Sequence, residues 1–355
     1  MNVGSFKEKM QRILRCEVAI SVLAVFMLMS SNEMAANTPW THLRSTPQDS
    51  TYVLPMRQYL SIRAYNIIKT TDLQVRNRDV GQPLIFRPNN GLGIGLGFTY
   101  KILALDLGFV IPATMRYRGD NPTTKFDLLS TLYGKKHVFD LTLQYYEGYD
   151  LANANAIFDG NPPQSALAMR SDISSVDLAL SYLYVMNHDK FSFQASFLGD
   201  VIQRKSAGSV TIHGFAGLYG LSADSALVRH EFGNGLDRQA HITQVTNLST
   251  GTGIGYAHTF VLPRNFFITL SGAPLLMLNA TLAEVNHPEY DDIEDTRFNM
   301  RLFTRNAVGY NAKRFYLIFN LIYDNFLVRA GEETRIDYAP LKMKLFFGYR
   351  IGKDL

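Results

Sequence analysis

The chain has 355 residues, 46% of them apolar, and a formal net charge of +4. Its mean hydropathy is −0.05. No run of about 18 apolar residues occurs, which excludes a helical membrane span. The mild charge, with basic residues that do not cluster, predicts no nucleic-acid partner.

The N-terminus has the pattern of an export signal. Four basic residues precede an apolar run at residues 18–29, and small residues follow it. We therefore predict a signal peptide at residues 1–36, cleaved between about residues 30 and 37. Its removal would take away Cys16, the only cysteine, as suits a protein that crosses an oxidising compartment. Residues 37–56 are rich in Pro, Ser and Thr and predict an extended periplasmic lead-in.

Residues 57–355 predict one transmembrane, antiparallel, up-and-down β-barrel of about twelve strands. In residues 341–350, apolar side chains alternate with Lys342, Lys344 and Arg350. That period of two is typical of a strand with one face in lipid and the other in the lumen. A soluble β-sandwich is the alternative, because its strands also alternate. The predicted strands are residues 59–68, 92–100, 103–109, 125–133, 138–146, 176–185, 191–198, 253–260, 266–276, 298–308, 315–327 and 341–350.

Tight basic turns and long polar loops alternate between these strands. Short turns face the periplasm and long loops face outward in bacterial outer-membrane barrels. The longest loop is predicted at residues 201–248, and we expect its strand-like part, residues 209–221, to form a hairpin above the membrane. A fourteen-stranded barrel with a further strand near residues 241–245 is the alternative. The other predicted long loops are residues 70–90, 111–124, 148–171, 281–296 and 329–339.

Aromatic residues stand beside the tight turns and predict a belt at the membrane edge. They are Tyr100, Tyr133, Phe139, Tyr184, Phe191, Phe260, Phe266, Tyr310 and Phe315. The expected partners of such a barrel are outer-membrane lipids, lipopolysaccharide and, during insertion, the barrel-assembly machinery.

Several segments resemble one known family, among them Arg87-Pro88-Asn89, residues 93–101, residues 132–140 and Gly348-Tyr349-Arg350. Together they resemble the domain-of-unknown-function 4421 family, exported proteins of Gram-negative bacteria expected to form outer-membrane barrels. The resemblance extends from about Asp49 to Arg350 and implies a location and a fold but no activity. The chain ends in Leu355 and not in an aromatic residue, so Tyr349 is the nearest candidate for a terminal assembly signal.

Charged residues fall on the predicted inner faces of the strands. A basic residue facing lipid near the midplane would cost about 2–4 kcal/mol, so the lumen is the expected place. In one interpretation opposite charges pair across a filled interior. In the other, four residues form a basic wall that selects anionic solutes; these are Arg301, Arg305, Lys342 and Lys344. The remaining lumen candidates are Arg63, Asp106, Asp140, Asp177 and Asp324.

Two glycine series alternate with large apolar residues at strand spacing. They lack the G-x-G-x-x-G spacing of a phosphate-binding loop. We expect them to leave room inside the wall for a plug, a loop or a neighbouring backbone. They are Gly91, Gly93, Gly95 and Gly97, and then Gly253 and Gly255.

The remaining polar groups predict no cofactor, metal or catalytic site. Residues 284–295 are acidic but match no ligand loop. His258, with Ser271 on the next strand, is a candidate hydrolase pair, but no G-x-S-x-G motif occurs and a membrane-interface histidine is favoured. Three functions remain: a small-solute channel or binding barrel, a structural or surface-interaction barrel with a plugged lumen, and an outer-membrane hydrolase. The solute stays unknown.

Overall fold

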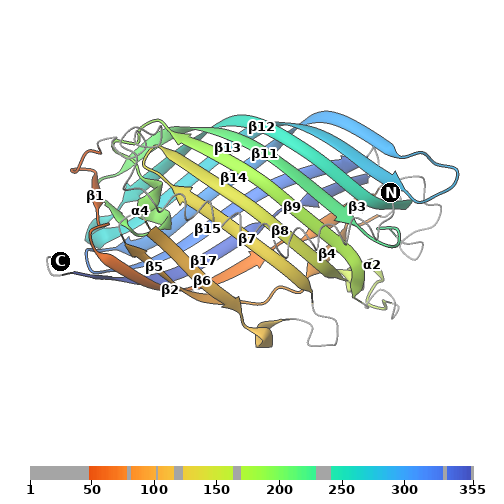
Figure 1. Ribbon diagram of the computed structural model, residues 1–355, viewed down its shortest axis with the longest axis horizontal. Helices are drawn as coiled ribbons and strands as arrows, with labels where there is room; N and C mark the ends of the chain where they lie inside the picture. Colours follow the sequence, from red (N-terminus) through yellow and green to blue (C-terminus); the bar gives the residue numbers. More distant parts are fainter. Residues whose placement is uncertain are drawn as a thin grey trace, which may run out of the picture. The chain divides into compact units, whose positions relative to one another are not determined.

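The computed structural model describes residues 48–77, 81–100, 103–115, 123–162, 169–228, 241–330 and 334–352. The predicted signal peptide and the first part of the lead-in lie outside these residues. Within them the chain forms a 15-stranded antiparallel sheet and a separate two-stranded sheet (Figure 1). No helix in these ranges is both long and apolar enough to cross a membrane.

The main sheet contains long strands and three short ones. The small sheet pairs β1 (Val53–Pro55) with β10 (Val201–Gln203). Short helices are η2 (Pro112–Thr114), α2 (Ala154–Ile157), α4 (Phe193–Phe197) and η5 (Pro263–Asn265). The short strands of the main sheet are β3 (Leu73–Asn77), β4 (Leu84–Pro88) and β16 (Thr334–Tyr338). The long strands are β2 (Leu60–Thr70), β5 (Gly93–Tyr100), β6 (Leu103–Val110), β7 (Thr124–Tyr133), β8 (His137–Leu151), β9 (Arg170–Val185), β11 (Ala207–Ser222), β12 (Ile242–Val261), β13 (Phe266–Val285), β14 (Ile293–Asn311), β15 (Phe315–Ala330) and β17 (Leu341–Ile351).

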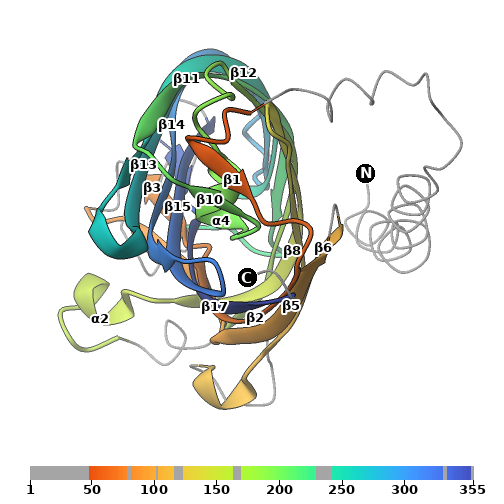
Figure 2. The same ribbon diagram turned by 90° about the vertical axis from the view of Figure 1, so that its left-hand side faces the viewer.

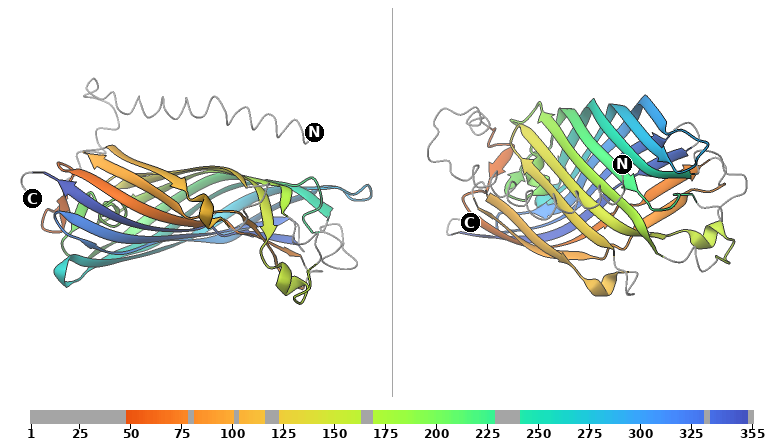
Figure 3. Two further views of the ribbon diagram at one scale, coloured as in Figure 1. Left: turned by 90° about the horizontal axis from the view of Figure 1, so that it is seen from below. Right: turned by 45° about the vertical axis from the view of Figure 1, so that its right-hand side comes forward.

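The long strands follow one another in chain order around the wall. From β7 to β15 each strand pairs with the next, apart from β10, which belongs to the two-stranded sheet. On its other side β15 pairs with β17, and the pairing goes on through β2 and β5 to β6. At the long-loop end, β16, β3 and β4 connect β15 to β8 and so close the circuit. The predicted all-β antiparallel barrel is confirmed. Figure 3 shows the oblique course of the strands.

The wall has an apolar outer face and a polar inner face. Along β5 the glycines are buried and the side chains between them are exposed. Leu96 is 65% exposed, and Ile254 and Phe298 are each 67% exposed. Such exposure of large apolar side chains is the reverse of a water-soluble surface.

Two sequence predictions about the strands are wrong. Residues 191–198 form no strand; they contain α4, whose five residues are all buried. Residues 209–221 are no hairpin above the wall, because β11 pairs with β9 on one side and β12 on the other. Residues 241–245, considered for a further strand, are largely the start of β12. The loop predicted at residues 201–248 is correspondingly shorter, since β11 ends at Ser222.

A plug, residues 191–203, fills the barrel at the tight-turn end. It connects β9 to β11, and Figure 2 shows α4 and β10 inside the ring of strands. Phe191, Phe193 and Phe197 are buried in one apolar cluster with inward side chains of β8, β9, β11, β12, β13, β14, β15 and β17. Because the plug is enclosed on every side, its polar residues are buried too: Gln194 Nε2 donates to the Tyr133 carbonyl at 2.5 Å.

Side chains of the wall anchor the plug. Asn311 Nδ2 donates to the carbonyls of Ala195 at 3.1 Å and Val201 at 3.0 Å. Arg350 donates to the Gly199 carbonyl. Burial raises the pKa of the Asp200 carboxyl above its ordinary value, although Arg57, 2.9 Å away, opposes that shift. These contacts hold the plug to the ends of β14 and β17.

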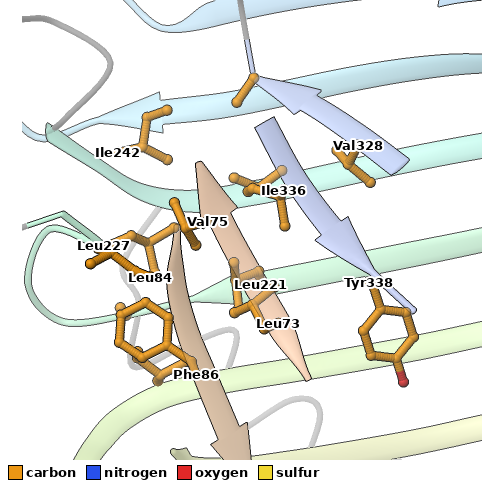
Figure 4. Packing of buried hydrophobic residues seen from close by; sticks show 14 of the residues in the cluster. Leu73, Val75, Leu84, Phe86, Leu221, Leu227, Ile242, Val328, Ile336 and Tyr338 are labelled. Carbon is orange, nitrogen blue, oxygen red and sulfur yellow. The ribbon is translucent and has the colours of Figure 1, made fainter. Parts of the chain in front are cut away.

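A cap closes the long-loop end. It is formed by β3, β4 and β16, whose inward side chains pack directly on the opposite wall (Figure 4). Leu84 and Ile336 are fully buried, in the same cluster as Leu221 and Val245. The segments predicted as the loops 70–90 and 329–339 therefore contribute strands to this cap.

Candidate functional site

A chamber lies in the lumen. Its volume is about 120 Å³. It is lined from β2, β7, β8, β9, β11, β12, β14, β15 and β17, so its walls come from nearly the whole circumference. Six of the predicted lumen residues line it: Asp140, Asp177, Arg301, Arg305, Asp324 and Lys342.

Both arginines of the predicted basic wall are neutralised by carboxylates. Arg301 Nε donates to Asp324 Oδ1 at 2.6 Å, and its guanidinium lies 3.8 Å from the centre of the Phe215 ring. Arg305 is paired with Asp140 and donates to the Tyr133 hydroxyl at 2.9 Å. These contacts favour the interpretation in which opposite charges pair across the interior.

The other three predicted lumen residues form a second cluster. Arg63 is 3% exposed, and its Nε donates to Asp106 Oδ1 at 2.7 Å. Lys344 Nζ donates to Asp106 Oδ2 at 2.6 Å and lies 4.2 Å from the centre of the Tyr65 ring. Asp106 therefore joins β6 to both β2 and β17 through ion pairs.

Sequence reasoning missed a polar network beside the chamber. Tyr338 donates to Gln144 Oε1 at 3.2 Å, Gln144 donates to Asp127 Oδ1 at 3.0 Å, and Lys69 donates to Asp127 Oδ2 at 2.7 Å. Gln144 could have been found, because it shares the face of Asp140 on the predicted strand. Lys69 lies one residue beyond the predicted end of its strand, between that strand and the predicted loop at residues 70–90.

In the part of the chain that the structure describes, two charged side chains of the chamber lack a direct hydrogen-bond or ion-pair partner. Lys342 and Asp177 make no hydrogen bond or ion pair with any residue that the structure describes. Arg301 Nη1 is likewise buried without an acceptor within those ranges. Charged groups removed from bulk water are costly unless paired. The chamber therefore presents free hydrogen-bonding capacity of both signs to a ligand.

The glycine series make room for side chains and for the neighbouring strand. A Cβ at Gly95 would meet the Tyr65 ring, and one at Gly97 would meet Asp106 and Arg63. A Cβ at Gly93 would meet Ile67. At Gly253 and Gly255 the obstruction is the wall strand β13, and at Gly91, just before β5, it is Thr114 and Val110.

Replacement of Gly95 by alanine is expected to destabilise the barrel by about 1–3 kcal/mol, because the added methyl group overpacks the Tyr65 ring. Gly214→Ala is the matched control, since a Cβ there meets no heavy atom within 4 Å. Urea unfolding of the refolded protein, followed by far-UV circular dichroism, measures both. Equal midpoints for the two variants would contradict this account of the glycine series.

Two of the predicted belt aromatics face inward. Tyr133 contacts Arg305, and Phe191 belongs to the plug. The prediction for Tyr133 was wrong because proximity to a tight turn does not distinguish the two faces of a strand. The prediction for Phe191 was wrong because this residue is not on a strand. Outward positions do hold for Tyr100, Phe260, Phe266 and Phe315, each at least 44% exposed.

The geometry separates the two residues considered as a hydrolase pair. His258 is opposite Leu270 on the outer face, where its Nδ1 lies 3.2 Å from the Tyr256 hydroxyl. Ser271 is opposite Ala257 on the inner face, and its hydroxyl donates to the Arg305 carbonyl at 2.6 Å. The two side chains cannot act together. Across the described ranges, no group of three or more acidic, histidine or cysteine residues is arranged to hold a metal ion.

An antiparallel barrel with a charged chamber between a plug and a cap is the class of structure that these features define. The chain belongs to the family described as "Domain of unknown function (DUF4421)", which it matches over residues 47–351. No curated protein matches it.

Solved barrels are similar to this chain at low identity. The outer-membrane protease OmpT from Escherichia coli is 7% identical, with a TM-score of 0.37 over 84% of this chain and 98% of that one. The translocator domain of the autotransporter NalP from Neisseria meningitidis is 9% identical, with a TM-score of 0.32 over 82% and 88%. The β domain of the Bordetella autotransporter BrkA is 14% identical, with a TM-score of 0.30 over 82% and 100%. These values are too low to transfer any activity.

Proposed function

We propose that this protein is a Gram-negative outer-membrane barrel that binds a small polar ligand in its lumenal chamber and does not conduct ions. The observation that carries the proposal is the chamber itself. It has charged side chains that pair with none of the described residues, and packed apolar clusters close the lumen at both ends.

The membrane location is supported by the distribution of polarity across the wall. Large apolar side chains cover the outer face, and nine predicted charges lie inside. Water would disfavour that arrangement, whereas hydrocarbon favours it. The export pattern of residues 1–36 is consistent with passage through the periplasm. Outer-membrane lipids and lipopolysaccharide would then contact the outer wall, and the barrel-assembly machinery would insert it.

Binding is preferred to passage because of the two closures. Three phenylalanines of the plug are buried in one apolar cluster with inward residues of eight strands. The cap buries side chains from opposite walls against each other. A chamber of about 120 Å³ is similar in volume to a cavity that holds one small organic molecule, which suits a small head group or solute.

Planar-bilayer recording of the refolded full chain tests the proposal. We expect no steady current at low voltage, because the plug and the cap would both have to move before ions could pass. The same preparation should migrate as a folded barrel on an unheated gel, which shows that an absence of current does not result from misfolding. A reproducible ohmic current from the folded protein would refute the closed chamber and restore the channel hypothesis.

A further inference from the structure

One position in the wall is unpaired. β6 pairs only with β5, and β7 pairs only with β8, so no backbone hydrogen bonds join β6 to β7 in the residues that the structure describes. We call this position the seam. The two strands are consecutive in the chain and occupy neighbouring places in the wall (Figure 1).

Only the long-loop end of the seam is bridged. Lys125 Nζ donates to Asn90 Oδ1 at 3.1 Å, and the Asn89 amide donates to Thr123 Oγ1 at 2.8 Å. Below these contacts, the described parts of β6 and β7 share no hydrogen bond or ion pair. An open sheet edge is not tolerated in hydrocarbon, because each unpaired backbone group needs a partner. In a membrane the seam must therefore be occupied by water or by a polar part of another molecule.

A row of three lysines stands behind the seam. Lys69 of β2 is directly opposite Lys342 of β17, and Lys344 follows two residues later on the same face. Lys69 is paired with Asp127 of β7, whereas Lys344 is paired with Asp106 of β6. The outer members of the row thus reach the two opposite edges of the seam. Lys342, between them, has no partner among the described residues and lines the chamber.

The outer surface beside the seam is apolar. Leu107 and Phe109 of β6 are 61% and 71% exposed, and Phe126 of β7 is 39% exposed. The chamber is too small for an acyl chain, but these side chains could contact one from outside the wall. The polar opening, the unpaired ammonium and the apolar surface together match an amphiphile with an anionic head.

We propose that the seam admits the phosphate or carboxylate head of a membrane amphiphile to Lys342, while its acyl chain stays against the outer wall. This inference rests on the proposed membrane barrel and names the ligand class of its chamber. Backbone N–H groups along the seam would donate to the entering head, and Lys342 would supply the charge that stabilises it.

Calorimetric titration of the full chain in non-ionic detergent tests the assignment. The probes are dihexanoyl phosphatidic acid, dihexanoyl phosphatidylcholine and inorganic phosphate. We expect the phosphatidic acid to bind most tightly, and Lys342→Gln to weaken it by about tenfold to a hundredfold, as the loss of one charge-assisted hydrogen bond implies. Lys342→Arg should preserve binding. Lys313→Gln, on an exposed tight turn, is the control with the same change of charge.

Each other outcome overturns a definite part of the inference. Inorganic phosphate binding as tightly as the lipid would mean that the acyl chain and the seam have no role. Weakening by Asp177→Asn as strong as that by Lys342→Gln would indicate a zwitterionic ligand held from both sides. A folded, non-conducting protein that binds none of the probes would refute this ligand class and leave the closed chamber standing, whereas conduction would refute the chamber.

Discussion

Arg305→Met is expected to destabilise the barrel by about 3–5 kcal/mol, because it leaves the Asp140 carboxylate unpaired in the interior. Arg305 is only 3% exposed and is also a donor to the Tyr133 hydroxyl. The double variant Arg305→Met/Asp140→Leu removes both charges and should recover most of this loss. About 1–2 kcal/mol should remain, since the Tyr133 hydroxyl then lacks its donor.

Urea unfolding in detergent micelles, with all variants compared as a double-mutant cycle, provides the measurement. The control is the ion pair of Arg76 with Asp337, in which Arg76 is 51% exposed. Its loss through Arg76→Met should cost less than about 1 kcal/mol. If Arg305→Met and Arg76→Met have the same effect, water reaches the Arg305 pair and the chamber is not enclosed.

The inward position of the charges could be predicted from sequence, but their partners could not. A strand whose outer face meets lipid excludes charge from that face, so alternation alone placed Arg305 inside. Its partner Asp140 lies 165 residues away in the chain. Which carboxylate meets which guanidinium depends on where the ring closes. For the same reason, the basic wall was an open interpretation until the pairs with Asp140 and Asp324 were located.

The plug was not predicted, because alternation of apolar and polar residues indicates a wall strand only when the two faces of the segment meet different surroundings. Phe191, Phe193 and Phe197 alternate with polar residues, and this pattern predicts a strand. A segment enclosed by the barrel has buried surroundings on all sides, so its polar side chains find partners inside: Ser196 pairs with Thr269 at 2.6 Å. Because residues 191–198 were counted as a strand, the requirement for an even number of strands then removed residues 209–221 from the predicted wall, to which they belong. An even number limits the count of strands but does not say which segments they are.

The seam left no trace in the sequence because pairing between neighbours is not encoded locally. β6 has the same alternation as its paired neighbour β5, and both are eight residues long. The glycines Gly95 and Gly97 did indicate close approach, although toward Tyr65 and Arg63 and not toward a separate plug. Local patterns therefore predicted the faces of strands well and the contacts across the lumen poorly.

Opening the plug is expected to expose the chamber without producing a current. In the variant Phe193→Ser/Phe197→Ser, each lost aromatic ring should cost about 3–5 kcal/mol of packing, enough to detach α4 from the wall. A cysteine at Ser181, which lines the chamber, reports access. Cys16 is the only native cysteine, so a Cys16→Ser background leaves a single thiol.

Labelling by a charged, membrane-impermeant maleimide should be slow in the otherwise native protein and at least about tenfold faster once the plug is detached, because a thiol reacts only when a reagent reaches it. The variant Phe193→Leu/Phe197→Leu retains apolar packing and should label slowly, which separates the plug from a general loss of stability. Neither the serine nor the leucine variant should conduct ions in a planar bilayer, since the cap still buries Leu84 and Ile336 against the opposite wall. Fast labelling of the native barrel would show that the reagent reaches the chamber past the plug or through the seam, and would contradict the closed state. A current from the serine variant would show that the cap does not block ions. Two independent closures in series require three results together. The native protein must label slowly, the serine variant must label fast, and neither protein may conduct ions.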